Sequence, residues 1–272
     1  MPNPTCATHV RARLDLRCDI PSSAALLVAV ARREGVEIVA EELTTTGPDG
    51  EFAVRELPDR FGTLLHEFTV PAGASSVEYT ATVRIDEAGA PALTDTERWE
   101  FTRPSRYCPS DRLLQFASRE FGRVPREELA NTVAQWVFDN TGYLSGSSLP
   151  TDTALETLLA RQGVCRDFAH LTTSLLRAMD VPARLCAVYA PGLSPMDFHA
   201  VVEAAPTGTW EIVDATRLAP RQALVRISTG RDAADTAFLT TAGPVRLETL
   251  EVLAVLDGEL PADDALAGVT LP

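Results

Sequence analysis

The chain has 272 residues, of which 45% are hydrophobic, and it carries a formal net charge of −14 at pH 7. A chain of this length and apolar content can bury a substantial core and can form two domains. The negative charge argues against nucleic acid or an anionic membrane as a partner, since both need a concentrated positive surface.

The first hundred residues show the alternation that is typical of strands. Apolar side chains occupy the even positions from Val10 to Cys18, and charged side chains occupy the odd positions between them. A second clear alternation runs from Val77 to Ile85. Further expected strands cover residues 25–30, 36–44, 51–57 and 64–70. Short strands at this spacing predict an antiparallel β-sandwich over residues 1–104.

The apolar runs and the cysteines indicate which compartment and which cofactors the chain is expected to have. The longest apolar run, residues 24–31, is too short to cross a bilayer, and no basic-then-apolar signal segment opens the sequence. The five cysteines show neither a CxxC pair nor the spacing of a zinc site. Cys18 and Cys186 lie among apolar strand residues and are expected in the core. We therefore expect a cytoplasmic protein in a reducing compartment, without a metal or another cofactor.

Helices dominate the next part of the chain. Residues 103–109 interrupt the strand pattern with two prolines, so we place a domain boundary near Pro104. Helices are expected at residues 111–121, after Pro125, and at residues 153–161, where Thr153 and Glu156 have the spacing of a capping box. Helices first and strands later predict an α+β fold for residues 105–272.

Cys165 opens the next helix instead of lying inside it. Phe168, Leu175 and Met179 lie on one apolar face of this helix, which ends at Val181-Pro182. The unpaired N–H groups of a helix's first turn stabilise a thiolate, which is the reactive form of cysteine. A buried structural cysteine is the equally weighted alternative, since that is the usual fate of a free thiol. Cys165 is therefore a candidate nucleophile.

Two strands with a hairpin turn follow, at residues 198–204 and 210–214. If the loop is the four residues 205–208, His199 faces Asp214 across the hairpin and their side chains share one face. An imidazole can take the thiol proton, and a carboxylate on its other nitrogen fixes the tautomer. Other strands are expected in the same C-terminal region at residues 183–189, 223–227, 236–241 and 245–255.

Four motifs carry a resemblance to a known family. They are GVCRDFAHL around Cys165, VPARLCAVY, FHAVVEA with His199, and WEIVDAT with Asp214. Together they resemble the transglutaminase-like superfamily of thiol enzymes, in particular its bacterial cysteine protease branch. The resemblance implies a papain-like fold for residues 105–272 and a catalytic triad of Cys165, His199 and Asp214. Many members carry a tryptophan two residues after the histidine, where this chain has Val201.

Four other residues have expected roles in or near the triad. Tyr143 precedes the helix and is a candidate oxyanion donor beside the Cys165 backbone N–H; an ordinary loop tyrosine is the alternative. Trp210 is expected to cover the hairpin, either as core or as a wall of the site. Asp167 and His170 point away from Cys165, because a helix turns about 100° per residue. Asp167 is expected to cap or brace a neighbouring segment.

The expected reaction is attack of Cys165 on an amide or related acyl group, with a thioester intermediate. The substrate would be a peptide, a protein or a small acyl compound. Water as the acceptor makes the chain a cysteine protease or amidase, which the family favours; an amine makes it a transglutaminase or amide-forming acyltransferase. The alternative from another class is a catalytically silent binding or scaffold module.

Overall fold

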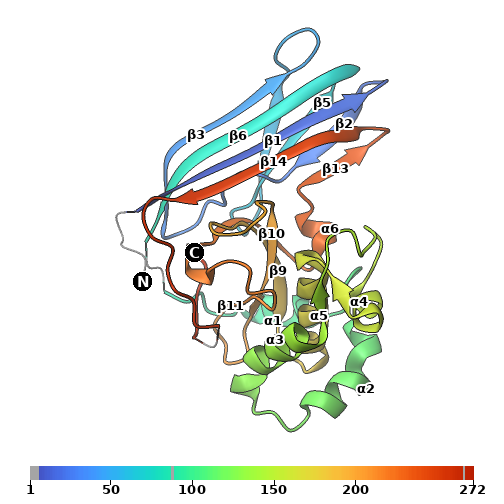
Figure 1. Cartoon of the computed structure of the whole chain (residues 1–272), viewed down its shortest axis with the longest axis vertical. Coiled ribbons are helices and arrows are strands. Elements are labelled where there is room, and N and C mark those ends of the chain that lie inside the picture. Colours follow the sequence, from blue (N-terminus) through green and yellow to red (C-terminus); the bar gives the residue numbers. More distant parts are fainter. Residues whose placement is uncertain (1–5, 87–88, 266) are drawn as a thin grey trace.

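The computed structural model describes residues 6–86, 89–265 and 267–272. A β-sandwich forms the upper half of the molecule in Figure 1, and a smaller sheet with helices forms the lower half. Among the helices of these described ranges, none combines the length and the apolar character that crossing a membrane requires.

The upper half consists of two four-stranded antiparallel sheets, which confirms the predicted sandwich. The first sheet runs, in spatial order, β14 (Arg246–Leu256), β1 (Ala7–Cys18), β6 (Gly73–Ile85) and β3 (Val36–Thr46). The second sheet runs β13 (Leu239–Ala242), β2 (Ser22–Leu26), β5 (Leu64–Val70) and β4 (Val54–Pro58). The even positions of β1 are buried between the sheets, as the alternation predicts.

Strands β13 and β14 correct the predicted division of the chain at Pro104. The sequence places both strands with the C-terminal region, and this prediction is wrong. β14 pairs with β1 from Thr8 opposite Leu256 to Arg17 opposite Arg246, and β13 pairs with β2. Alternation shows that a strand has a buried face, but it does not identify the neighbouring strand. The sandwich is therefore built from both ends of the chain.

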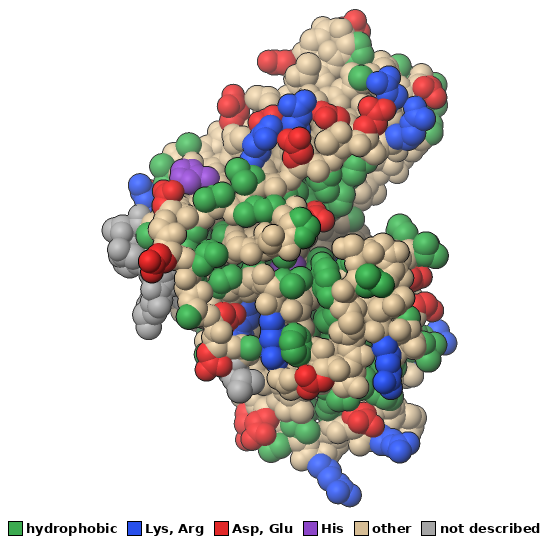
Figure 2. Space-filling view, viewed as in Figure 1, with side chains coloured by type: hydrophobic (Ala, Val, Ile, Leu, Met, Phe, Trp, Pro, Cys, Tyr) green, Lys and Arg blue, Asp and Glu red, His purple; other side chains and the backbone are tan. Residues whose placement is uncertain are grey.

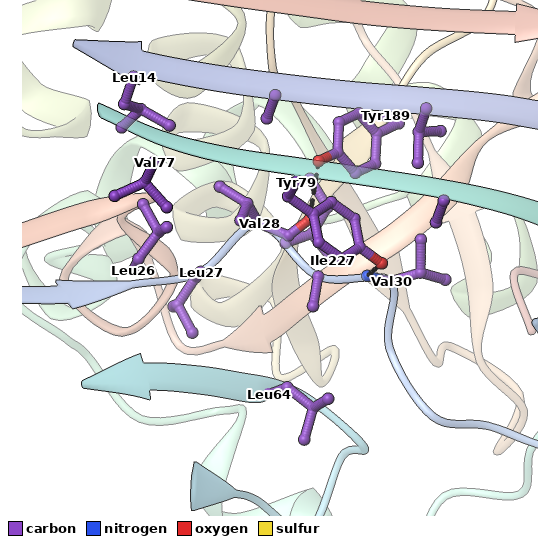
Figure 3. Packing of buried hydrophobic residues seen from close by; sticks show 14 of the residues in the cluster. Leu14, Leu26, Leu27, Val28, Val30, Leu64, Val77, Tyr79, Tyr189 and Ile227 are labelled. Carbon is purple, nitrogen blue, oxygen red and sulfur yellow. Dashed lines mark hydrogen bonds between the residues drawn. The ribbon is translucent and has the colours of Figure 1, made fainter. Parts of the chain in front are cut away.

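The sandwich core continues into the lower half, as Figure 3 shows. Tyr189 and Ile227 come from the lower sheet and belong to the same buried cluster as Val28 and Tyr79 of the upper half. The Tyr189 hydroxyl donates to the carbonyl of Val28 at 2.7 Å. This shared core fixes the sandwich against the lower sheet.

The lower half has the predicted α+β arrangement. Its antiparallel sheet runs β11 (Glu211–Val213), β10 (His199–Ala204), β9 (Ala183–Tyr189) and β12 (Val225–Gly230). Helix α5 (Cys165–Ala178) packs on β9 and β10 (Figure 1). Three further helices pack against α5, namely α2 (Ser110–Phe121), α3 (Leu129–Asn140) and α4 (Ala154–Ala160). Thr153 caps α4 through the predicted capping box with Glu156.

Several short elements complete the chain. They are α1 (Asp95–Glu100), α6 (Ala233–Thr236), two 3-10 turns at Arg126–Glu128 and Arg221–Ala223, and the parallel pair β7 (Gly142–Tyr143) and β8 (Gln162–Gly163). Helix α1 is absent from the sequence-based prediction. The sequence does contain a signal for the start of this helix, because Thr94 and Glu97 have the spacing of a capping box and form one.

Candidate active site

Cys165 is the first residue of α5, as predicted, and its side chain is half-buried. The turn before it requires Gly163, since a Cβ there would lie 2.6 Å from the Cβ of Asp167. Asp167 fixes the helix start by accepting a hydrogen bond from the Val164 N–H at 2.9 Å. It also accepts one from the Ser148 hydroxyl at 2.5 Å. The predicted capping role of Asp167 is thus seen in the structure.

The start of β10 brings His199 to this helix end. The Cys165 sulfur lies 4.0 Å from the carbonyl oxygen of Phe198, the residue before the histidine. The His199 ring is 1% exposed, and its Nε2 lies 2.9 Å from Oδ2 of Asp214. Its Nδ1 is buried and has no hydrogen-bond partner in the described part of the chain. Nδ1 is therefore the ring nitrogen that can interact with the Cys165 side chain.

Asp214 is held by Thr216, a residue that the sequence-based prediction missed. The backbone N–H and the hydroxyl of Thr216 both donate to Oδ1 of Asp214, each at 2.8 Å. The same hydroxyl lies 3.4 Å from Nε2 of His199. An aspartate with a hydroxyl residue two positions later is a known local hydrogen-bonding pattern, so Asp214 and Thr216 offered a usable signal.

The predicted hairpin register is wrong by two residues. The structure pairs Val202 with Val213 and Ala204 with Glu211, and the turn between the strands is longer than the four residues expected. A shift of two residues leaves every side chain on its original face, because the side-chain period of a strand is two. His199 and Asp214 therefore still meet, as diagonal neighbours.

Each member of the pair shifts the pKa of the other. Burial lowers the pKa of His199, but the Asp214 carboxylate and the Cys165 side chain outweigh it and raise this pKa to about 10. Burial also raises the pKa of Asp214, but His199 and the donors of Thr216 bring it below its usual range. At neutral pH the pair is an imidazolium beside a carboxylate, which suits a histidine that partners a thiolate.

Tyr143 lies against Cys165, at the place where the sequence suggests an oxyanion donor or wall. It interacts with both the backbone and the side chain of Cys165, and its ring is 5.9 Å from that of Phe168. Burial and the charge of Cys165 raise the pKa of Tyr143 to about 12. The hydroxyl therefore keeps its proton at neutral pH and is able to donate it in a hydrogen bond.

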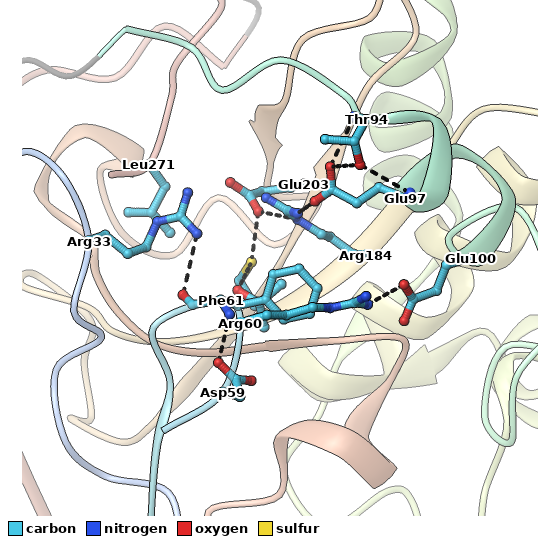
Figure 4. Close-up of polar contacts among 12 residues, drawn as sticks. Arg33, Asp59, Arg60, Phe61, Thr94, Glu97, Glu100, Arg184, Glu203 and Leu271 are labelled. Carbon is cyan, nitrogen blue, oxygen red and sulfur yellow. Dashed lines mark hydrogen bonds and ion pairs between the residues drawn. The ribbon is translucent and has the colours of Figure 1, made fainter. Parts of the chain in front are cut away.

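Trp210 is not brought to this cluster. Its side chain is 1% exposed, its ring meets that of Phe101 edge to face at 5.7 Å, and the Arg184 guanidinium lies 4.0 Å above it. Arg184 in turn contacts Glu203 and Glu97, and Glu97 belongs to helix α1. Figure 4 shows these three side chains together. Of the two roles expected for Trp210, the structure has the core role.

The other thiols and the nearby histidine are poor candidates for chemistry. Cys186 is fully buried, 3.2 Å from Glu203, and burial raises its pKa to about 11. Burial likewise raises the pKa of Cys108 to about 12. His170 stacks on Tyr107, and burial lowers its pKa to about 4. In the described ranges, no group of three or more His, Cys, Asp or Glu side chains is placed to hold a metal ion.

Known proteins resemble this chain in sequence and in fold. The model of the transglutaminase-like superfamily matches residues 115–215, which include Cys165, His199 and Asp214. The crystal structure of a "Putative Cysteine Protease" from Cytophaga hutchinsonii superposes with a TM-score of 0.86 and 32% identity. This likeness covers 97% of this chain and 96% of that chain.

Curated relatives match over shorter stretches. An uncharacterized protein of Mycobacterium leprae is 26% identical over 154 residues, which are 52% of this chain and 53% of that protein. An uncharacterized protein of Mycobacterium tuberculosis is 33% identical over 97 residues, 35% of this chain and 30% of that protein. The chain thus matches about half the length of the first relative and less of the second.

The fold, the matched region and the full-length crystal relative agree with one another and confirm the resemblance seen in the motifs. The chain belongs to the transglutaminase-like superfamily.

Proposed function

We propose that the chain is a thiol-dependent acyl-transfer enzyme that cleaves an amide through a thioester on Cys165, with water as the acceptor. The observation that carries the proposal is the meeting of three side chains. Cys165 opens a helix beside His199, whose far nitrogen binds Asp214 at 2.9 Å. The cysteine protease name of the Cytophaga hutchinsonii relative favours hydrolysis over transfer to an amine.

In the first step, the Cys165 thiolate attacks the acyl carbon and a carbon–sulfur bond forms. The Cys165 N–H and the Tyr143 hydroxyl are the proposed donors to the oxyanion. The carbon–nitrogen bond then breaks, and Nδ1 of His199 gives its proton to the leaving amine. Asp214 keeps the ring oriented and stabilises its charged form.

In the second step, water attacks the thioester while Nδ1 of His199 takes a proton from it. The carbon–sulfur bond breaks, the carboxylic acid leaves, and the Cys165 thiolate is restored beside the imidazolium. An amine in place of water would give a new amide by the same route, so the acceptor is the variable that an experiment has to identify.

Trapping of the acyl group tests this proposal. The protein is incubated with p-nitrophenyl acetate or a peptide mixture, and its intact mass is measured with and without a fluorescent primary amine. We expect an acyl adduct that hydroxylamine removes and that Cys165→Ala lacks, with free acid as the product even when the amine is present. An amide product would instead identify an acyltransferase. No adduct with any donor would leave a binding or scaffold role.

A further inference from the structure

Strand β14 lies at the edge of the upper sheet, on the side that faces the lower half (Figure 1). Its neighbour within the sheet is β1, and no strand of the described residues pairs with its other edge. Figure 2 shows a hollow between the sandwich and the helical half, with hydrophobic side chains along it. An uncovered strand edge offers backbone donors and acceptors to a further strand.

The free backbone groups of β14 can be identified from one contact. The N–H of Ala254 points away from β1 and reaches the sulfur of Met196 at 3.2 Å. Backbone groups of alternate residues point to opposite edges of a strand, so those of Leu250 and Val252 point the same way. No hydrogen bond among the described residues uses these outward groups of Leu250 and Val252.

Met196 links this edge to the candidate active site. It lies two residues before Phe198, whose carbonyl oxygen is 4.0 Å from the Cys165 sulfur. A thioether is a weak acceptor, so a peptide carbonyl would replace it at the Ala254 N–H with a stronger hydrogen bond. A peptide strand along β14 would therefore lead towards Cys165.

Side chains around the edge indicate what kind of peptide fits. Leu253 and Val255 are 43% and 42% exposed on the outer face of β14, where they would meet apolar side chains of an added strand. Asp197, between Met196 and Phe198, is exposed and accepts a hydrogen bond from the Phe198 N–H at 2.7 Å. Burial raises its pKa and the charge of His199 opposes this rise, but no arginine or histidine of the described ranges forms an ion pair with it. Its carboxylate favours a basic residue where the peptide reaches the site.

We propose that β14 binds an extended peptide segment of the substrate as an additional strand, through Leu250, Val252 and Ala254, with a basic residue of the peptide near Asp197. This inference deepens the proposed function, on which it rests, because it names the substrate class of the same site. The combination of backbone hydrogen bonds with alternating side-chain contacts is the known mode of strand addition.

Binding to the full chain carrying Cys165→Ala tests the inference without requiring catalysis. The probe is a fluorescein-labelled peptide of about ten residues, long enough for one strand, that alternates threonine and valine around a central lysine. Two N-methylated forms are compared, one methylated at the odd positions and one at the even positions. We expect one form to bind about tenfold or more weakly and the other to bind as the parent, because only one set of N–H groups faces β14.

Protein variants provide a second arm. Val252→Pro removes an outward N–H that has no partner among residues 6–86, 89–265 and 267–272, and an edge strand tolerates proline at such a position. We expect it to weaken peptide binding about tenfold, with Val252→Ala as the matched control that keeps the N–H. Thermal unfolding verifies that both variants fold.

Parent and methylated peptides that bind equally, or a parent peptide that does not bind, would overturn strand addition. Neither result would bear on the thioester, which the p-nitrophenyl acetate arm of the trapping experiment tests without a peptide. A peptide with glutamate in place of the central lysine is expected to bind more weakly; equal binding would overturn the role given to Asp197.

Discussion

Cys165→Ala is expected to lower the turnover of p-nitrophenyl acetate by at least about a thousandfold. Removal of the nucleophile from a catalytic triad costs this much or more, and the remaining activity comes from binding and oxyanion donors alone. The effect should appear in kcat with an unchanged fold, because Cys165 is half-buried at a helix start and the alanine fits there. Release of p-nitrophenol gives the rate, and circular dichroism checks the fold.

Two other cysteines supply the controls for that variant. Cys6→Ala alters a half-buried thiol away from the site and should leave kcat unchanged. Cys186→Ala alters a buried thiol next to Glu203, so it should lower stability but keep kcat within a few-fold. A full loss of kcat in Cys186→Ala with full activity in Cys165→Ala would contradict the assignment of the nucleophile.

Glu203→Gln is expected to reduce the free energy of unfolding by about 3–5 kcal/mol, since it leaves the buried Arg226 without its counter-charge and leaves Arg184 with Glu97 alone. Glu203 is fully buried in β10 and contacts Arg226 at 2.5 Å and Arg184 at 2.7 Å. Figure 4 shows its carboxylate beside Arg184. Urea denaturation at neutral pH measures the change.

Glu248→Gln is the matched control, because Glu248 pairs with Arg17 on the surface and such pairs contribute only about 0–1 kcal/mol.

Burial raises the pKa of Glu203, but Arg226 and Arg184 outweigh it and lower this pKa far below its usual range. Its contribution to stability is thus present above the unfolded pKa of about 4.3 and is lost as the pH falls towards the folded value. Equal unfolding free energies for the two variants would contradict this account.

Local sequence patterns predicted much of the fold. Alternation located β1 and β6, the capping box at Thr153 located α4, and the apolar face after Cys165 located α5. Each of these signals depends on residues that are neighbours along the chain. For the same reason, His199 and Asp214 could be placed on one face even though the register was wrong.

Contacts between distant segments could not be predicted in this way. The partner of β14 is β1, more than two hundred residues away in the sequence, and neither strand has a sequence pattern that identifies the other as its partner. Glu203 carries no local signal of its role, because its partners Arg184 and Arg226 lie on two other strands. Trp210 could be assigned to the core only once the position of Phe101 was known.

The alkylation rate of Cys165 as a function of pH tests the thiolate–imidazolium pair most directly. Iodoacetamide labelling is followed by peptide mass spectrometry in the unmodified chain and in His199→Ala, with Cys6 as the internal reference thiol. We predict that Cys165 reacts rapidly well below pH 8, and that this early reaction disappears in His199→Ala. Equal pH profiles for Cys165 and Cys6, unchanged by His199→Ala, would contradict the account.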